Sequence, residues 1–157
     1  VAVGMALSAR MSGEDYRVYT LLGDGEIEEG QVWEAAMFAG NRRLDNLVAI
    51  VDYNNLQIDG TLDQVNSPVP IPAKFEAFRW NVIEVMDGSD FDQLREAFAG
   101  ARAHKGAPSC IVMHTVKGKG VSYMENACEW HGKAPNDEQF ALAMEELNQA
   151  EEALCQR

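Results

Sequence analysis

Y-R-V-Y-T-L-L-G-D-G-E-I-E-E-G, residues 16–30, and N-L-V-A-I-V-D-Y-N-N, residues 46–55, decide the fold of this chain. Each is an apolar run with β-branched residues that leads into a polar residue, Asp24 in the first and Asn54 in the second. A segment with helical spacing separates them, so the pattern predicts a strand, a helix and a second, parallel strand. Because ligands collect beyond the carboxyl ends of parallel strands, we expect Asp24 and Asn54 to share one site.

The residues at these strand ends suit a magnesium ion. Asp24 offers a carboxylate, Asn54 an amide oxygen and Leu56 a backbone carbonyl, and Mg²⁺ prefers such oxygen ligands. Gly23 and Gly25 flank the aspartate, so the backbone can turn sharply beside a bulky anion, at which the following helix would point its free N–H groups. An Asp-Gly pair alone also fits an ordinary turn. The second polar pair, one strand–helix–strand unit further on, favours a diphosphate held through a metal.

Composition limits the class of protein. The chain has 157 residues, 46% of them hydrophobic and 24% charged, which suits one globular domain. A net charge of −12 without a Lys/Arg cluster argues against nucleic acid or an anionic membrane as partner. No apolar run approaches the roughly 20 residues that a membrane span needs. The three cysteines lack metal-type pairing, and the Cys128-x-x-His131 spacing has no second ligand pair, so we expect a reducing, cytoplasmic compartment without a zinc site.

Strand and helix patterns alternate along the chain, which predicts a parallel sheet flanked by helices. The expected strands are residues 17–22, 47–53, 81–86 and 109–115, and the expected helices are 1–11, 28–40, 73–79, one that Asp90 caps, and 136 to about 154. The apolar residues expected to be buried on the last two helices are Phe91, Leu94, Ala97, Phe98, Ala101, Phe140, Met144, Leu147 and Leu154. The chain begins with neither methionine nor a helix cap, so truncation at the N-terminus is expected.

Four spaced motifs resemble those of the transketolase family of thiamine diphosphate enzymes. They are G-D-G-E-I-E-E-G-Q-V-W-E-A-A (23–36), L-D-N-L-V-A-I-V-D-Y-N-N (44–55), H-T-V-K-G-K-G-V (114–121) and E-W-H-G-K-A-P-N (129–136). Together they extend over nearly the whole chain. The resemblance implies the thiamine-diphosphate-binding α/β fold, with residues 1–157 as a single diphosphate-binding domain.

The resemblance also implies a cofactor site whose members are spread over the chain. They are Gly23, Asp24, Gly25, Glu29, Asn54, Leu56, Lys117 and His131. Asp24, Asn54 and the Leu56 carbonyl would hold Mg²⁺, or Ca²⁺ or Mn²⁺ in its place. Gly25, Asn54 and Lys117 would hold the diphosphate side.

Three of these residues have other interpretations from the sequence alone. Glu29 falls in the first turn of the expected helix, where a carboxylate favours the helix dipole. Lys117, in a Lys-Gly-Lys-Gly run, also fits a solvated turn. His131 fits a structural histidine as well as a donor to a developing oxyanion. The resemblance implies that Glu29 links cofactor sites across a subunit interface, that Lys117 contacts the cofactor, and that His131 is catalytic at the substrate carbonyl.

The expected function is that of a transketolase subunit, which transfers a two-carbon ketol unit from a ketose phosphate to an aldose phosphate. The pyrimidine-binding domain of the family is absent from this sequence, so the chain resembles the N-terminal subunit of split transketolases. It would then be active only with a partner chain, in a heterotetramer. Two alternatives stay open: an enzyme like deoxyxylulose-phosphate synthase or another sugar-phosphate thiamine enzyme, and a non-catalytic remnant that binds cofactor or only assembles with a partner.

Overall fold

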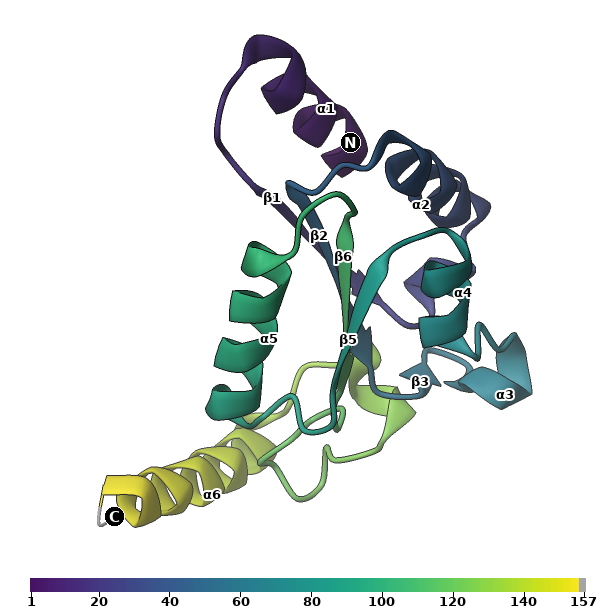
Figure 1. Ribbon diagram of the computed structural model, residues 1–157. Helices are drawn as coiled ribbons and strands as arrows, with labels where there is room; N and C mark the ends of the chain where they lie inside the picture. Colours follow the sequence, from purple (N-terminus) through teal and green to yellow (C-terminus); the bar gives the residue numbers. More distant parts are fainter. Residues whose placement is uncertain (156–157) are drawn as a thin grey trace.

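A four-stranded parallel sheet lies at the centre of the molecule, with helices on both of its faces (Figure 1). The computed structural model describes residues 1–155. The strands run in the order β1-β2-β6-β5 and comprise β1 (Val18–Gly23), β2 (Leu47–Tyr53), β5 (Asn81–Val85) and β6 (Ser109–His114). A small antiparallel hairpin, β3 (Leu56–Gln57) with β4 (Gly60–Thr61), follows β2.

Helices complete the layers. The α-helices are α1 (Ala2–Ser12), α2 (Gly30–Arg42), α3 (Leu62–Val65), α4 (Ile71–Ala77), α5 (Phe91–Ala103) and α6 (Asp137–Cys155), and the 3-10 turns are η1 (Glu26–Glu28) and η2 (Cys128–His131). In Figure 1, α5 covers one face of the sheet, α2 and α4 cover the other, and α6 extends away from the body of the molecule. The sheet is therefore covered on both sides, as the sequence predicts for this fold class.

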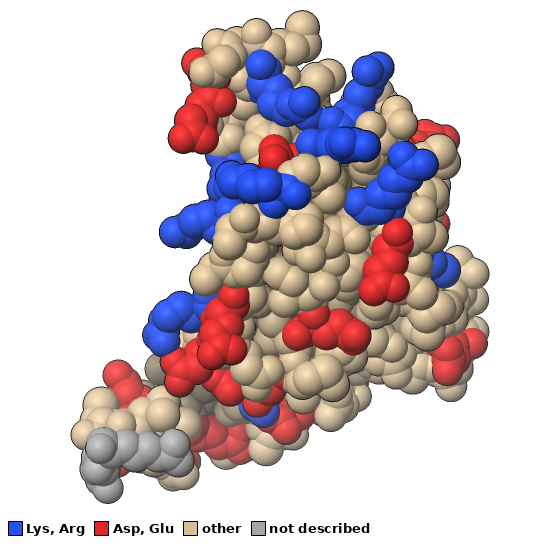
Figure 2. Space-filling view, in the orientation of Figure 1, with Lys and Arg blue, Asp and Glu red and all other residues tan. Residues whose placement is uncertain are grey.

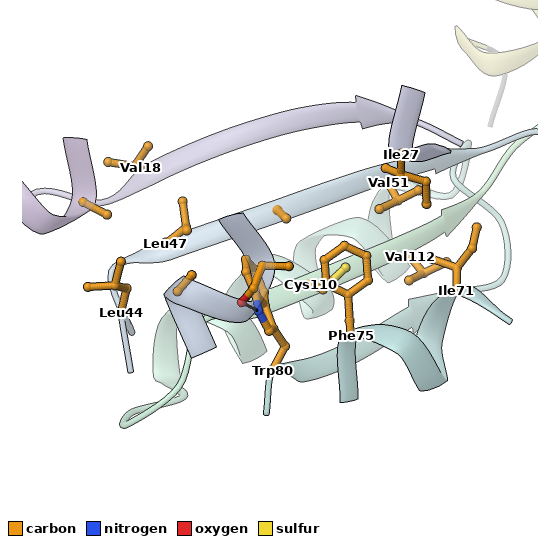
Figure 3. Close-up of a cluster of buried hydrophobic side chains, with 14 residues drawn as sticks. Val18, Ile27, Leu44, Leu47, Val51, Ile71, Phe75, Trp80, Cys110 and Val112 are labelled. Carbon is orange, nitrogen blue, oxygen red and sulfur yellow. Dashed lines mark hydrogen bonds between the residues drawn. The ribbon is translucent and has the colours of Figure 1, made fainter. Parts of the chain in front are cut away.

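The central strand β2 is apolar on both faces because it is buried on both. Leu47, Ala49 and Val51 belong to the core cluster shown in Figure 3, which also contains Phe75 of α4. Val48 points the other way, into a second cluster beneath α5. Alternation with a period of two thus places successive residues of one apolar run in two separate cores.

Small residues on α2 let it approach the chain that leads into β5. Ala36 and Ala39 are buried, and the Trp80 indole N–H donates to the Ala36 carbonyl at 2.9 Å. A Cβ added at Gly40 would lie 1.8 Å from the Phe78 carbonyl oxygen, so only glycine fits there. The predicted small-residue face of this helix is confirmed.

The expected strands and helices are present, with ends that differ by one to three residues. The largest shift at a helix start is in α2, which begins at Gly30 rather than at residue 28, because residues 26–28 form the 3-10 turn η1. The cap of α5 is confirmed, since the Asp90 carboxylate accepts from the N–H groups of Asp92 and Gln93. The hairpin β3-β4 and the short helix α3 were not expected.

Several side chains predicted to be buried are exposed. Phe91 is 78% exposed at the first position of α5. On α6 only Ala143 is buried, and Phe140, Met144, Leu147 and Leu154 are all exposed. The apolar spacing on α6 is real, but among the described residues no element covers that face, so the prediction of a buried stripe was wrong.

Candidate functional site

The turn after β1 places Asp24 between the ends of two neighbouring strands. Gly23 pairs with Asp52 of β2, and the Asp24 N–H donates to the Asp52 carbonyl at 3.1 Å. The Asp24 side chain is 2% exposed. Its Oδ1 accepts the Gly25 N–H at 2.8 Å and its Oδ2 accepts the Asn55 N–H at 2.5 Å. One carboxylate therefore joins the turn after β1 to the loop after β2.

Burial raises the pKa of the Asp24 carboxyl above its ordinary value of 3.8. The backbone N–H groups of Asn55, Gly25 and Asn54 act in the opposite direction, and the neighbouring Asp52 carboxylate raises the pKa further. A cation beside Asp24 would favour its ionised form. The position therefore suits a metal ligand.

The loop after β2 presents the two other predicted metal ligands. Asn55 has a φ of 64°, in the left-handed region, and this turns the chain sharply. The Asn54 Oδ1 accepts the Leu56 N–H at 3.0 Å, which fixes the amide with its oxygen toward the loop. An amide oxygen has a second lone pair, so this bond leaves it able to bind a cation. One carboxylate, one amide oxygen and one carbonyl oxygen form a donor set that suits a hard cation such as Mg²⁺.

Lys117 and His131 approach the same place from the loop after β6. The Lys117 ammonium lies 3.2 Å from His131 Nδ1. Gly118, with a φ of 75°, allows this loop to fold closely on itself, since an added Cβ there would lie 2.5 Å from the Met124 carbonyl oxygen. A pocket of about 490 Å³ collects both sides. Its lining residues are Gly23, Asp24, Gly25, Glu26, Asp52, Asn54, Leu56, Gln57, Ile58, Asp59, Lys117 and His131.

The structure thus brings together every predicted site residue except one. Glu29 is exposed, caps α2 without a side-chain hydrogen bond and does not line the pocket. Because η1 precedes α2, the first N–H groups after the Gly-Asp-Gly turn belong to a 3-10 turn, so the expected helix N-terminus beside the anion is displaced by residues 26–28. The expected position of Glu29 in the first turn of the helix was therefore wrong.

The pocket contains acidic and amide side chains that the sequence analysis did not single out. Glu26 accepts the Gly23 N–H at 3.0 Å, and the Gln57 amide donates to Glu28 at 2.8 Å. Asp52 also lines the pocket. Its signal in the sequence was a charged residue at the end of an apolar strand, two positions before Asn54.

No group of three or more His, Cys, Asp or Glu side chains that could hold a metal is present within residues 1–155. The expected absence of a zinc-type cluster and the proposed magnesium ligands are compatible, because two of those three ligands are neutral oxygens. Within the same residues, no helix has the length and apolar character needed to cross a membrane.

Known proteins resemble this chain over almost its full length. The model of the family described as "Transketolase, thiamine diphosphate binding domain" matches residues 6–153. A 6-deoxy-6-sulfo-D-fructose transketolase subunit of Clostridium sp. (strain MSTE9) is 44% identical over 93% of this chain and 53% of its own length. One of the two subunits of an apulose-4-phosphate transketolase of Phocaeicola vulgatus is 43% identical over 98% of this chain and 54% of its own length. The chain therefore spans about half the length of these curated relatives.

Solved structures have the same fold. Transketolase from Campylobacter jejuni superposes with a TM-score of 0.83 at 29% identity, over 92% of this chain and 23% of that one. A Pichia stipitis transketolase in complex with sedoheptulose 7-phosphate superposes with a TM-score of 0.84 at 27% identity, over 90% of this chain and 22% of that one. The fold, the family model and the relatives agree, and the chain belongs to the transketolase family, of which it carries the thiamine diphosphate binding domain.

Proposed function

We propose that this chain holds the diphosphate of thiamine diphosphate through Mg²⁺ in the pocket beyond β1, β2 and β6. The observation that carries the proposal is the buried Asp24 carboxylate, fixed by two backbone N–H groups at the end of β1, in a pocket that Asn54 and Lys117 also line. Asp24, the Asn54 Oδ1 and the Leu56 carbonyl would hold the metal, and Ca²⁺ or Mn²⁺ could replace Mg²⁺ at such oxygens.

The charge of the pocket supports a metal between protein and diphosphate. Four carboxylates line it, against one lysine and one histidine. A diphosphate would be repelled by this acidic surface, and a divalent cation at Asp24 would reverse the local sign of charge. Lys117 would then contact the outer oxygens of the diphosphate.

His131 is oriented by its neighbour. A lysine ammonium only donates hydrogen bonds, so the contact between Lys117 and the ring requires the lone pair on His131 Nδ1. The proton of the neutral ring then lies on Nε2, which is free to donate to a substrate oxygen. We assign His131 the role of polarising the substrate carbonyl.

The proposed reaction is ketol transfer. When bound, thiamine diphosphate supplies the electron sink that carries a two-carbon unit from a ketose phosphate to an aldose phosphate. The residues of this chain hold the diphosphate, keep the metal and orient the sugar. The pyrimidine-binding domain would come from a partner chain in a heterotetramer, and Glu29, exposed at the start of α2, would lie at that contact.

The donor sugar is proposed by class. Relatives of this chain are named for 6-deoxy-6-sulfo-D-fructose and for apulose 4-phosphate, two sugars that carry an anionic group. We propose a sugar with a terminal phosphate or sulfonate as donor. Within the same chemistry, a reaction like that of deoxyxylulose-phosphate synthase is the alternative, and acceptor specificity distinguishes the two.

The test is a reconstitution. The chain, in its longest natural form, is mixed with a candidate pyrimidine-domain partner, thiamine diphosphate, Mg²⁺ and ribose 5-phosphate. The donors are xylulose 5-phosphate, apulose 4-phosphate and 6-deoxy-6-sulfofructose in parallel. We expect a ketose two carbons longer than the acceptor with at least one donor, and about a 100-fold loss of that product with His131→Ala. Bound cofactor without product from any donor would contradict ketol transfer and favour a non-catalytic role.

A further inference from the structure

The carboxyl ends of β2 and β6 are joined by a side-chain hydrogen bond in addition to the backbone ladder. The Thr115 hydroxyl donates to Asp52 Oδ1, and the Thr115 N–H donates to the Tyr53 carbonyl at 3.1 Å. On its other side, the Asp52 carbonyl accepts the Asp24 N–H at 3.1 Å. Asp52 therefore contacts chain segments at the ends of both strands that flank β2.

These two residues stand immediately before the two halves of the pocket. Asp52 precedes Asn54 by two positions, and Thr115 precedes Lys117 by two positions. Asn54 belongs to the metal side of the pocket and Lys117 to the diphosphate side. The bond between Asp52 and Thr115 thus connects the two loops before they diverge.

We propose that Asp52 and Thr115 are positioning residues that fix the separation between the metal ligands and Lys117, so that one diphosphate can contact both. The inference rests on the proposed function, because it names residues that serve the same pocket. A diphosphate that spans a metal and a lysine needs both at a set distance. A loop that must be ordered at the moment of binding lowers the affinity.

Thr115→Val tests the pair, because valine keeps the shape of threonine and removes the hydroxyl. Two affinities are measured: that of Mn²⁺ alone, from the electron paramagnetic resonance of the free ion, and that of thiamine diphosphate at saturating Mn²⁺, by calorimetry. We expect the Mn²⁺ affinity to stay within about threefold of the wild type. The thiamine diphosphate affinity should fall by about fivefold to tenfold, the usual worth of one hydrogen bond to a charged group.

Two control variants separate positioning from general destabilisation. Thr115→Ser keeps the hydroxyl and should restore the thiamine diphosphate affinity to within about twofold of the wild type. Ser89→Ala removes a bond of the same type, from the Ser89 hydroxyl to Asp87 at 2.6 Å, in the loop between β5 and α5, and should leave both affinities unchanged. Adding Thr115→Val to Asp52→Ala should cost nothing further, since the bond is already lost.

Three results would count against these assignments, each in its own way. A thiamine diphosphate affinity unchanged in Thr115→Val would overturn the positioning pair and leave the site intact. Equal losses of Mn²⁺ and thiamine diphosphate affinity, in step with a lower melting temperature, would show a structural bond only. A wild-type protein that binds neither Mn²⁺ nor thiamine diphosphate would contradict the proposed function itself.

Discussion

Asp24 combines burial with a formal charge. It is one of the few buried polar side chains, and its pKa is raised because burial outweighs the backbone N–H groups that stabilise its charge. A folded-state pKa above that of the unfolded chain means that the metal-free folded protein holds the proton more tightly. In the window from 3.8 up to that raised value, Asp24 therefore makes a contribution to stability that is lost as the pH rises.

The same shift predicts the pH dependence of metal binding. A metal ion binds the ionised carboxylate, so protons compete with it, and a raised pKa moves the competition to higher pH. As the pH is lowered, we expect Mn²⁺ affinity to begin falling before the range in which an ordinary aspartate titrates, by about tenfold per pH unit below the Asp24 pKa. Titrations of Mn²⁺ at a series of pH values measure this. An affinity that stays constant down to the ordinary carboxyl range would refute the expectation.

At the residue scale the sequence predicts chemistry better than it predicts contacts. Asp24, Asn54, Lys117 and His131 lie in one pocket as expected, because each follows a strand whose carboxyl end faces the same edge of the sheet. Glu29 does not line the pocket, since its place depended on where α2 begins. A 3-10 turn of three residues leaves no periodic signal that could have shown this.

At the scale of elements, α2 is positioned by glycine and alanine against the chain that leads into β5. The Trp80 indole bonds to the Ala36 carbonyl, and Gly40 lies beneath the Phe78 carbonyl oxygen. Because α2 follows the Gly-Asp-Gly turn, its packing also holds the pocket's first loop in place. The small-residue pattern predicted this close approach, although it could not name the surface that α2 meets.

Gly40→Ala tests this packing. The added methyl group meets backbone rather than a movable side chain, so we expect the free energy of unfolding to fall by about 1–3 kcal/mol, measured by urea denaturation. Gly30→Ala is the matched control on the same helix, since an added Cβ at Gly30 meets nothing within 4 Å. It should raise stability by about 0.5 kcal/mol. Equal effects of the two substitutions would contradict the packing account.

The helix α6 shows where periodicity stops being informative. Its apolar residues recur at helical spacing, yet Phe140 and Leu154 are 57% and 66% exposed. A pattern predicts which residues share a face, but whether that face is covered depends on what lies beside it. The first half of α6 is held to the loop after β6, where Ser122 donates to Glu146 through both its N–H, at 2.7 Å, and its hydroxyl.

At the scale of the molecule, charge is distributed unevenly over a chain with a net charge of −12. Figure 2 shows Lys and Arg gathered on the upper part of one face, toward α1, while Asp and Glu predominate lower down, toward α6. Composition predicted the sign of the charge but not this separation, which arises only when the parallel sheet sets one strand edge against the other. An anionic cofactor on so acidic a protein depends on local cations, which makes the metal central to cofactor binding.

The most direct test of a metal-held cofactor is calorimetric titration of thiamine diphosphate with Mg²⁺ into the wild-type chain and into Asp24→Ala. Asp92→Ala is the control, because it removes an exposed aspartate on α5 that pairs with Arg95 far from the pocket in sequence. We predict binding to the wild type and to Asp92→Ala, and a loss of about 100-fold in Asp24→Ala with the fold retained by circular dichroism. Equal affinity in all three proteins would contradict a cofactor held through a metal at Asp24.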